Sequence, residues 1–411
     1  MIVTNHYHNI KAVLVFDKFK IKFLKARVNL TNLVQSETKI NGEDPNNKLP
    51  AKIASKLNHI VASLPTYTPY IAAVQAALEA PLQKWRDDID APNSLVILGS
   101  PLLPFSDILN DAIASLEQKE RLEVRSLQLS ARPHDFQNIQ NLLDHQLPKA
   151  SEVPELGELT ASTEILKFRK NLMVINRLDW CFLRCIDGLY TIEYLRNLVF
   201  KDASVFWLIG CNNWAWRYLD FIFQVSAYFG QIVSLPNAKG DELQSWLKPA
   251  IEQIDLEFSE ELTPEKISES QELYFESLAD NSSGISSVAA ALWLRSLRYE
   301  SDSETEDPEA QFESDLIPPF KLKQKKPKLP DLPNLIPEDR YILYSLLLHG
   351  GMSLSQLALS LGEAESPVKA RVQFLVQSDV IDRYKNLLVV NPAYYPRLKT
   401  LLYSNNFLVG D

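Results

Sequence analysis

Glycine is scarce in this sequence. Twelve of the 411 residues are glycine, about 3%, against a usual share of roughly 7%. No two glycines are spaced as G-x-G, and none is followed by lysine. The motifs G-x-G-x-x-G and G-x-x-x-x-G-K-[ST] need those glycines so that backbone N–H groups can approach a phosphate closely. The scarcity therefore excludes both motifs in their working form.

Basic charge, cysteine and long apolar runs are also in short supply. The formal net charge is −10, so the chain as a whole shows no polyanion-binding composition. Three cysteines are too few for a disulfide framework and indicate a reducing compartment. No segment approaches the roughly 20 apolar residues of a membrane span, and the N-terminus lacks a signal-peptide core. We therefore expect a cytoplasmic protein with no membrane span.

Metal ligands do not cluster in the sequence. Cys181 and Cys185 lie one helical turn apart, but no histidine or second cysteine pair stands close to them. Buried thiols that act as small hydrophobic groups are the favoured interpretation, and we expect no metal site.

Between residues 65 and 250, short apolar runs alternate with helical patterns. Strands are expected at 94–99, 122–129, 172–175, 205–211 and 232–235, with helical segments between them. This alternation predicts an α/β domain with a mostly parallel sheet covered on both faces. Trp207, Trp214 and Trp216, near the fourth strand, are expected in its core, with a lining of a small-molecule pocket as the alternative.

The flanking segments differ in composition. Residues 1–64 are expected to form a partly β extension, because Phe19, Ile21 and Phe23 alternate with lysines. Residues 251–298 are expected to form a helical lid. Residues 299–336 run from eight acidic residues at 300–315 to five lysines at 321–328, with several prolines. That composition predicts an extended, solvated linker.

The last segment, residues 337–411, has the element order of a winged helix-turn-helix domain. Helical patterns at 338–349, 353–361 and 366–377 precede a hairpin-like pair at 380–390 and a closing helix at 393–403. Seven basic and seven acidic residues from Glu338 onward balance in charge, whereas DNA binding rests on a net basic face. A protein-binding or intramolecular role is therefore favoured over DNA binding. The candidate contact residues are Lys369 and Arg371 on the third helix and Arg383 and Lys385 on the wing.

A degenerate phosphate loop follows the first expected strand. The spacing laid out from Gly99 puts Pro104 at the second glycine, Phe105 at the lysine and Ser106 at the hydroxyl position. Proline has no N–H to offer a phosphate, and phenylalanine carries no charge. The third strand leads into Asn176, where an acidic residue would hold magnesium. The acid Asp179 stands three positions later.

The strand succession and three segments resemble a degenerate branch of the AAA+/STAND P-loop ATPases. The segments are 177–195 (RLDWCFLRCIDGLYTIEYL), 206–219 (FWLIGCNNWAWRYL) and 288–297 (VAAALWLRSL), and the resemblance covers about residues 65–298. It implies a P-loop NTPase-like core with a helical lid, to which a C-terminal winged helix is a common companion. It also implies a polar sensor residue at Asn212 and a nucleotide-contacting lid arginine at Arg295 or Arg298.

Three functions remain open from the sequence. The favoured one is a non-catalytic regulatory or scaffold protein that binds a protein partner and needs no cofactor. The second is a transcriptional regulator that binds DNA through the winged helix. The third is an active ATPase that binds ATP with an unconventional loop.

Overall fold

The structure is a computed structural model, and it describes residues 49, 51–88, 90–120, 122–127, 129, 132–133, 137–147, 170–254, 256–257, 264–299 and 322–407. The alternating segment around Phe19–Phe23 lies outside these residues, as do most of the acidic stretch and the last four residues.

A five-stranded parallel sheet forms the centre of the α/β domain. Its strand order is β2-β3-β4-β1-β5, so the chain crosses over between β1 and β2 and again between β4 and β5. The three inner strands are almost entirely buried, as their apolar sequences require. The strands are β1 (Ser94–Gly99), β2 (Glu123–Leu127), β3 (Asn171–Ile175), β4 (Val205–Asn212) and β5 (Gln231–Ser234).

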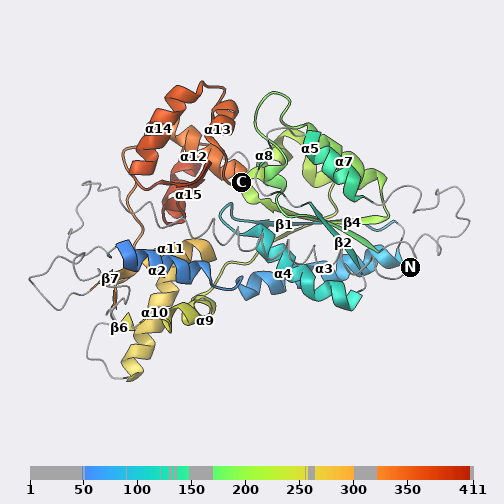
Figure 1. Cartoon of the computed structure of the whole chain (residues 1–411). Coiled ribbons are helices and arrows are strands. Elements are labelled where there is room, and N and C mark those ends of the chain that lie inside the picture. Colours follow the sequence, from blue (N-terminus) through green and yellow to red (C-terminus); the bar gives the residue numbers. More distant parts are fainter. Residues whose placement is uncertain are drawn as a thin grey trace, which may run out of the picture.

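Helices cover both faces of this sheet, as the sequence predicts. Helices α3 and α4 pack against each other on one face, and α5 and α7 lie with α8 on the other (Figure 1). Their bounds are α3 (Thr68–Asp87), α4 (Phe105–Glu120), α5 (Gln137–Gln146), α7 (Tyr190–Lys201) and α8 (Asn213–Phe223), with short 3-10 turns η4 (Leu178–Trp180) and η5 (Val225–Ala227).

A smaller helical part follows the sheet and also includes residues from before it. Helix α2 packs against α9 and α11, and α10 packs against both of those. The segment before residue 65 is thus helical where it is described. The bounds are α2 (Ala51–Ala62), α9 (Gly240–Ile251), α10 (Pro264–Asn281) and α11 (Ser286–Ser296).

The expected solvated linker contains a buried strand, which corrects that part of the prediction. Strand β8 (Leu322–Gln324) pairs with β7 (Leu297–Tyr299) and β6 (Leu256–Glu257). Leu322 is fully buried as part of the hydrophobic core, while the next residue, Lys323, is partly exposed, because successive side chains of a strand point to opposite faces.

The C-terminal unit, residues 337–404, has three helices, a two-stranded hairpin and a closing helix, in the predicted order. Ser353 caps the second helix, and Gly350 and Gly362 end the first two helices in left-handed conformation. The bounds are α12 (Pro337–His349), α13 (Leu354–Leu361), α14 (Glu365–Gln377), β9 (Ile381–Tyr384), β10 (Leu387–Val390), η7 (Pro392–Tyr394) and α15 (Tyr395–Ser404).

Candidate functional site at the carboxyl edge of the sheet

The sheet register brings the ends of the inner strands together. Gly99 at the end of β1 lies opposite Asn212 at the end of β4, and Ile175 at the end of β3 lies opposite Ile209. Ligands of open α/β sheets bind outside this carboxyl edge, where the strand order reverses. The predicted residues Gly99, Asn176 and Asn212 therefore do share one edge.

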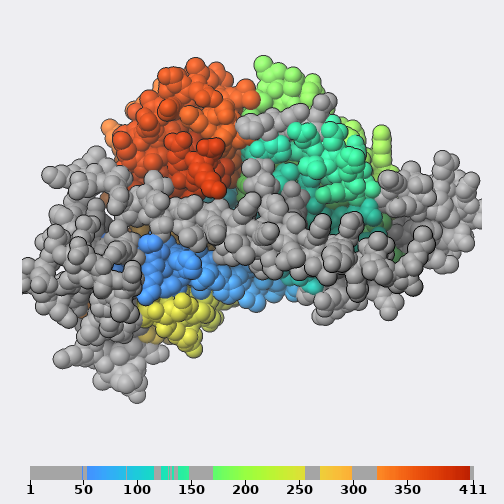
Figure 2. All heavy atoms as spheres, in the orientation of Figure 1, coloured from blue at the N-terminus to red at the C-terminus, as the bar shows by residue number. Residues whose placement is uncertain are grey.

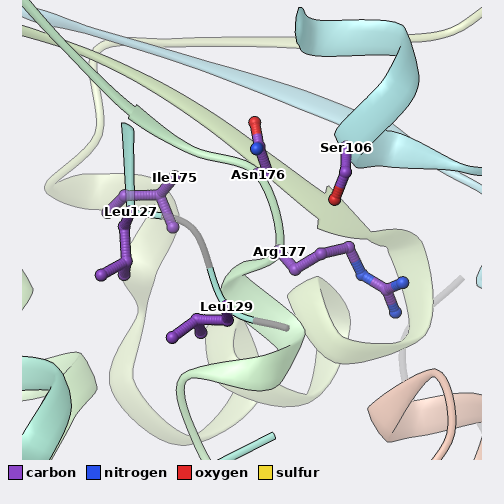
Figure 3. A pocket seen from close by; sticks show the side chains of 6 residues that line it. All are labelled: Ser106, Leu127, Leu129, Ile175, Asn176 and Arg177. Atoms are coloured by element: carbon purple, nitrogen blue, oxygen red, sulfur yellow. The ribbon is translucent and has the colours of Figure 1, made fainter. Parts of the chain in front are cut away.

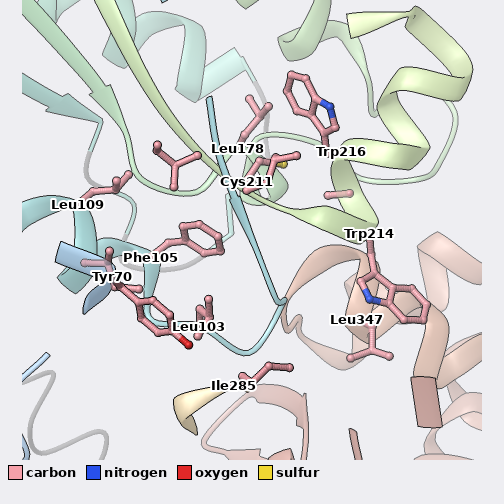
Figure 4. Packing of buried hydrophobic residues seen from close by; sticks show 14 of the residues in the cluster. Tyr70, Leu103, Phe105, Leu109, Leu178, Cys211, Trp214, Trp216, Ile285 and Leu347 are labelled. Carbon is pink, nitrogen blue, oxygen red and sulfur yellow. The ribbon is translucent and has the colours of Figure 1, made fainter. Parts of the chain in front are cut away.

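The loop between β1 and α4 is filled by the side chain of Phe105. This ring is 1% exposed and packs against the two glycines of the neighbouring strands. A Cβ at Gly99 would lie 3.2 Å from the ring, and one at Gly210 would lie 3.1 Å from it. Figure 4 shows Phe105 among the apolar side chains beneath this edge. The position that the motif assigns to lysine is thus part of the hydrophobic core.

The backbone donors of the loop are used within the loop. Leu103 N–H donates to the carbonyl of Ser100 at 3.1 Å, and Phe105 N–H donates to the carbonyl of Leu103 at 2.9 Å. Pro101 and Pro104 have no N–H. A phosphate cradle needs several amides that point at the ligand, and four of the positions between Gly99 and Ser106 do not supply one.

A small hollow remains beside Ser106 and Asn176 (Figure 3). Its volume is about 200 Å³, including the part open to solvent, which is less than the roughly 300–1,000 Å³ of ordinary ligand sites. Asn176 is 5% exposed. Among the described residues its amide nitrogen makes only long hydrogen bonds, of 3.4 Å to Asn110 and 3.5 Å to Ser126. The lining residues are Ser106, Leu127, Leu129, Ile175, Asn176 and Arg177.

Helix α12 of the C-terminal unit ends directly over this edge. The amide nitrogen of Asn212 donates to the carbonyl of Leu348 at 3.0 Å, and its oxygen caps α8 by accepting from Ala215 N–H at 2.8 Å. Both polar atoms of the predicted sensor residue are therefore occupied, and the residue is fully buried. In the space-filling view the C-terminal unit adjoins the atoms of the α/β domain (Figure 2).

Arginines from two loops meet the next carbonyls of the same helix end. Arg132, which follows β2, donates to the carbonyl of His349 at 2.5 Å. Arg177, which follows β3, donates to the carbonyl of Gly350 at 3.4 Å. The last carbonyls of a helix lack intrahelical partners and carry the negative end of its dipole. The guanidinium groups therefore satisfy the end of α12.

The arginines are themselves held by the loop after β3. Arg177 forms an ion pair with Asp179, which is fully buried. Arg132 donates to the carbonyl of Asp179 at 2.7 Å and also to that of Phe182. Burial lowers the pKa of Arg132 to about 10. The displaced acid Asp179 thus orients an arginine, which is a structural role.

The His349 ring is buried between the C-terminal unit and the α/β domain. Its Nε2 accepts a hydrogen bond from the backbone N–H of Arg184 at 3.3 Å, and its ring lies 4.9 Å from that of Phe182. Burial is the main cause that holds the pKa of His349 well below its usual value, and Arg132 and Arg184 add to it. The ring is neutral in this environment, because Nε2 is an acceptor.

Aromatic side chains extend the contact on the other side of α12. Trp214 donates from its indole nitrogen to the hydroxyl of Tyr395 at 3.1 Å, and Arg217 donates to the hydroxyl of Tyr403 at 2.8 Å. Trp207, Trp214 and Trp216 are all buried, so they pack as core residues rather than line a pocket.

The remaining predicted residues lie away from the strand ends. Arg295 lies over the ring of Tyr394 at 5.6 Å, on the contact between α11 and η7. Arg371 is held by two hydrogen bonds to buried Asp339, of 2.8 and 2.5 Å, because that carboxylate needs a partner inside the unit. The exposed candidates are Lys369, Arg383 and Lys385.

Sequence reasoning missed Arg132, Arg184 and His349. Arg132 belongs to no motif, and Arg184 lies in the quoted segment 177–195 without a pattern that sets it apart. His349 is recognisable only as the last residue of a predicted helix before Gly350-Gly351. The contacts of the two arginines with His349 join residues that are 165 or more positions apart in the chain. No local pattern carries that information.

Two further observations concern metals and membranes. In the part of the chain that the structure describes, no three histidine, cysteine or acidic side chains lie close enough together to hold a metal ion. Burial raises the pKa of the Cys181 thiol to about 12. None of the described helices combines the length and the apolar character that crossing a bilayer requires.

Comparisons with known proteins give only distant likenesses. No protein-family model matches the chain, and no curated protein is significantly similar to it. Among solved structures, the Thermotoga maritima RuvB Holliday junction branch migration motor is 18% identical, with 80% of this chain and 93% of that chain covered and a TM-score of 0.32. The ADP form of the Aeropyrum pernix ORC2 protein is 13% identical, with coverages of 82% and 94% and a TM-score of 0.35. Structural similarity this low does not indicate a function. The α/β fold is established by the five-stranded parallel sheet of this chain.

Proposed function

We propose that this chain is a catalytically silent protein of the AAA+/STAND P-loop type. In this proposal it acts in the cytoplasm as a regulator or scaffold through protein contacts of its α/β domain and of a C-terminal winged-helix domain. The observation that carries the proposal is the filled carboxyl edge of the sheet. Phe105 occupies the inner side of that edge, and the end of α12 occupies its outer side.

Three further features support the absence of catalysis. The loop amides at Leu103 and Phe105 bond within the loop. Asn176 offers no charge where magnesium would bind. Asn212 is fully buried and engaged at both its polar atoms, so a phosphate has no access to it. A nucleotide would have to displace α12 and still find no lysine.

Calorimetric titration with Mg-ATP and Mg-ADP tests this proposal, together with a phosphate-release assay on the same protein. We expect no heat beyond dilution and no turnover above the buffer rate. The matched variants Asn212→Ala and Asn213→Ala separate the third candidate, an ATPase with an unconventional loop. An activity that Asn212→Ala abolishes and Asn213→Ala leaves intact would establish that ATPase. Micromolar nucleotide binding without turnover would contradict the filled site on which the proposal rests.

DNA binding is the second candidate function, favoured by one observation. Lys369 on α14 and Arg383 and Lys385 on the hairpin are exposed, so all three side chains are accessible to a phosphate backbone. Two features weaken the case. Arg371 is committed to Asp339, and Glu363 and Glu365 are exposed near the start of α14. Like charge beside a phosphate contact opposes binding.

Fluorescence anisotropy with a labelled DNA duplex at low salt discriminates the two functions. The scaffold proposal expects no binding that depends on Lys369. If DNA is the partner, Lys369→Glu should weaken binding uniformly across sequences and reduce the salt dependence by about one counterion. Lys201→Glu, an equal charge change on exposed α7, serves as the control.

A further inference from the structure

The contact between α12 and the α/β domain encloses one histidine side chain. His349 is fully buried, and Nε2 accepts from the backbone N–H of Arg184. Nδ1 makes no hydrogen bond of ordinary geometry with the described residues, although the backbone of Asp179 lies close enough to favour a proton on the ring. Protonation of Nε2 removes the acceptor and therefore breaks the hydrogen bond from Arg184 across the contact.

The charged groups around the ring are mostly positive. Arg132 comes from the loop after β2, and Arg177 and Arg184 come from the segment after β3. Asp179 is the one carboxylate at this contact in the described chain, and it is already paired with Arg177. The Cys181 thiol stays neutral, because burial raises its pKa. A protonated His349 would add a positive charge to a cluster that already has an excess of them.

The rest of α12 offers no compensation. The acidic residues of this helix, Glu338 and Asp339, stand in its first turn, whereas His349 is its last residue. Asp339 is moreover paired with Arg371. The carbonyl of Asp179 favours the protonated ring, but it is opposed by burial, Arg132 and Arg184.

We propose that His349 is a proton-operated latch: protonation of its ring releases the C-terminal unit from the carboxyl edge of the sheet. The latch deepens the proposed scaffold role, since it controls when the C-terminal unit is available to a partner. It rests on the docked geometry and does not require that nucleotide binding be absent.

The size of the effect follows from proton linkage. The undocked ring titrates near its ordinary pKa of about 6.5, whereas the docked ring resists protonation. Docking is therefore fully favoured above about pH 6.5. As the pH falls below that value, the docking equilibrium constant should drop by up to about tenfold per pH unit, because one proton is taken up on release.

The test compares the full-length protein with His349→Gln between about pH 8 and about pH 5. A glutamine oxygen can accept the Arg184 N–H without titrating. Small-angle X-ray scattering reports separation of the unit, and hydrogen exchange at the Arg184 amide, corrected for intrinsic exchange, reports loss of the hydrogen bond. Far-UV circular dichroism on the same samples reports whether the fold persists.

We expect the wild type to open on acidification while it retains its secondary structure. We expect the His349→Gln protein to stay closed. Asp382→Asn, which removes a carboxyl group of the same unit whose pKa burial raises to about 7, should open like the wild type. Equal opening of His349→Gln, a wild type that stays closed, or opening only together with loss of secondary structure would each overturn the latch.

A second variant covers the case in which His349→Gln does not fold. Arg184→Gln keeps the backbone N–H but removes a positive charge that faces the ring. The guanidinium also contacts the carbonyl of Ser360 and the ring of Tyr344 in the C-terminal unit, so this variant docks more weakly at every pH. Its total loss of docking between about pH 8 and about pH 5 should nevertheless be smaller than that of the wild type, because the docked ring resists protonation less. An equal pH dependence would contradict the proposal. The nucleotide and partner-binding tests are separate measurements, so a failed latch and a failed scaffold role remain distinguishable.

Discussion

Single residues at the strand ends decide what this fold can do. The sequence correctly places Gly99, Asn176 and Asn212 at one edge, because parallel strands end on the same side of a sheet. It also shows that Phe105 cannot replace a lysine. The sequence does not show where the ring goes, since its place is set by Gly99 and Gly210 on two different strands. The glycines serve close packing of an aromatic ring here.

Gly350 and Gly362 provide a matched pair of residues for testing the docked contact. Both have positive φ, +63° and +69°. Alanine at either position should cost about 1 kcal/mol of folding free energy from backbone conformation alone. A Cβ at Gly362 meets no atom within 4 Å, but one at Gly350 collides with the Arg177 guanidinium and the Asp179 carboxylate.

Gly350→Ala should therefore lower the free energy of unfolding by about 1–3 kcal/mol more than Gly362→Ala, because the buried ion pair must shift. Urea unfolding followed by tryptophan fluorescence measures the difference. Equal losses for the two variants would show that Arg177 and Asp179 do not lie against the end of α12.

At the scale of elements, the spacing of apolar residues predicts most of the helices and strands. The five strands and the helices of the C-terminal unit appear where the sequence places them, with boundaries that differ by a few residues at most. Helix α8 begins at Asn213, directly after β4, because the Asn212 side chain caps it. Strand β8 is not predicted, because it has only three residues and stands among lysines and prolines. Three residues are too few to show the alternation of apolar and polar side chains that identifies a strand. Its partners β6 and β7 are distant in sequence.

The orientation of α12 is the element-scale feature that local pattern could not reveal. Its last turn exposes carbonyl groups, and any buried donor can satisfy them. In this chain the donors are Asn212, Arg132 and Arg177, which follow three different strands. These donors come together only when the sheet has formed. The position of α12 therefore depends on the order of the strands in the sheet and cannot be predicted from local sequence.

At the scale of the whole molecule, the contact joins two units that could otherwise move independently. Tyr395 and Tyr403 of α15 both reach α8, but their surroundings differ. Tyr395 is 1% exposed and accepts the indole N–H of buried Trp214, whereas Tyr403 is half-buried and accepts from Arg217. The first hydrogen bond lies inside the contact and the second lies at its rim.

This difference predicts unequal costs for removing the two hydroxyl groups. Tyr395→Phe leaves the Trp214 N–H buried without an acceptor and should lower the free energy of unfolding by about 1–3 kcal/mol. Tyr403→Phe should cost less than about 1 kcal/mol, because water replaces the hydroxyl beside Arg217. Urea unfolding at about pH 8, where His349 is neutral in both docked and undocked protein, isolates this effect.

In the wild type, tryptophan fluorescence and circular dichroism should report one coincident transition, since docking couples the units. Tyr395→Phe should shift that transition to lower urea or split it in two, and a shift no larger than that of Tyr403→Phe would mean that the units are not coupled through Trp214.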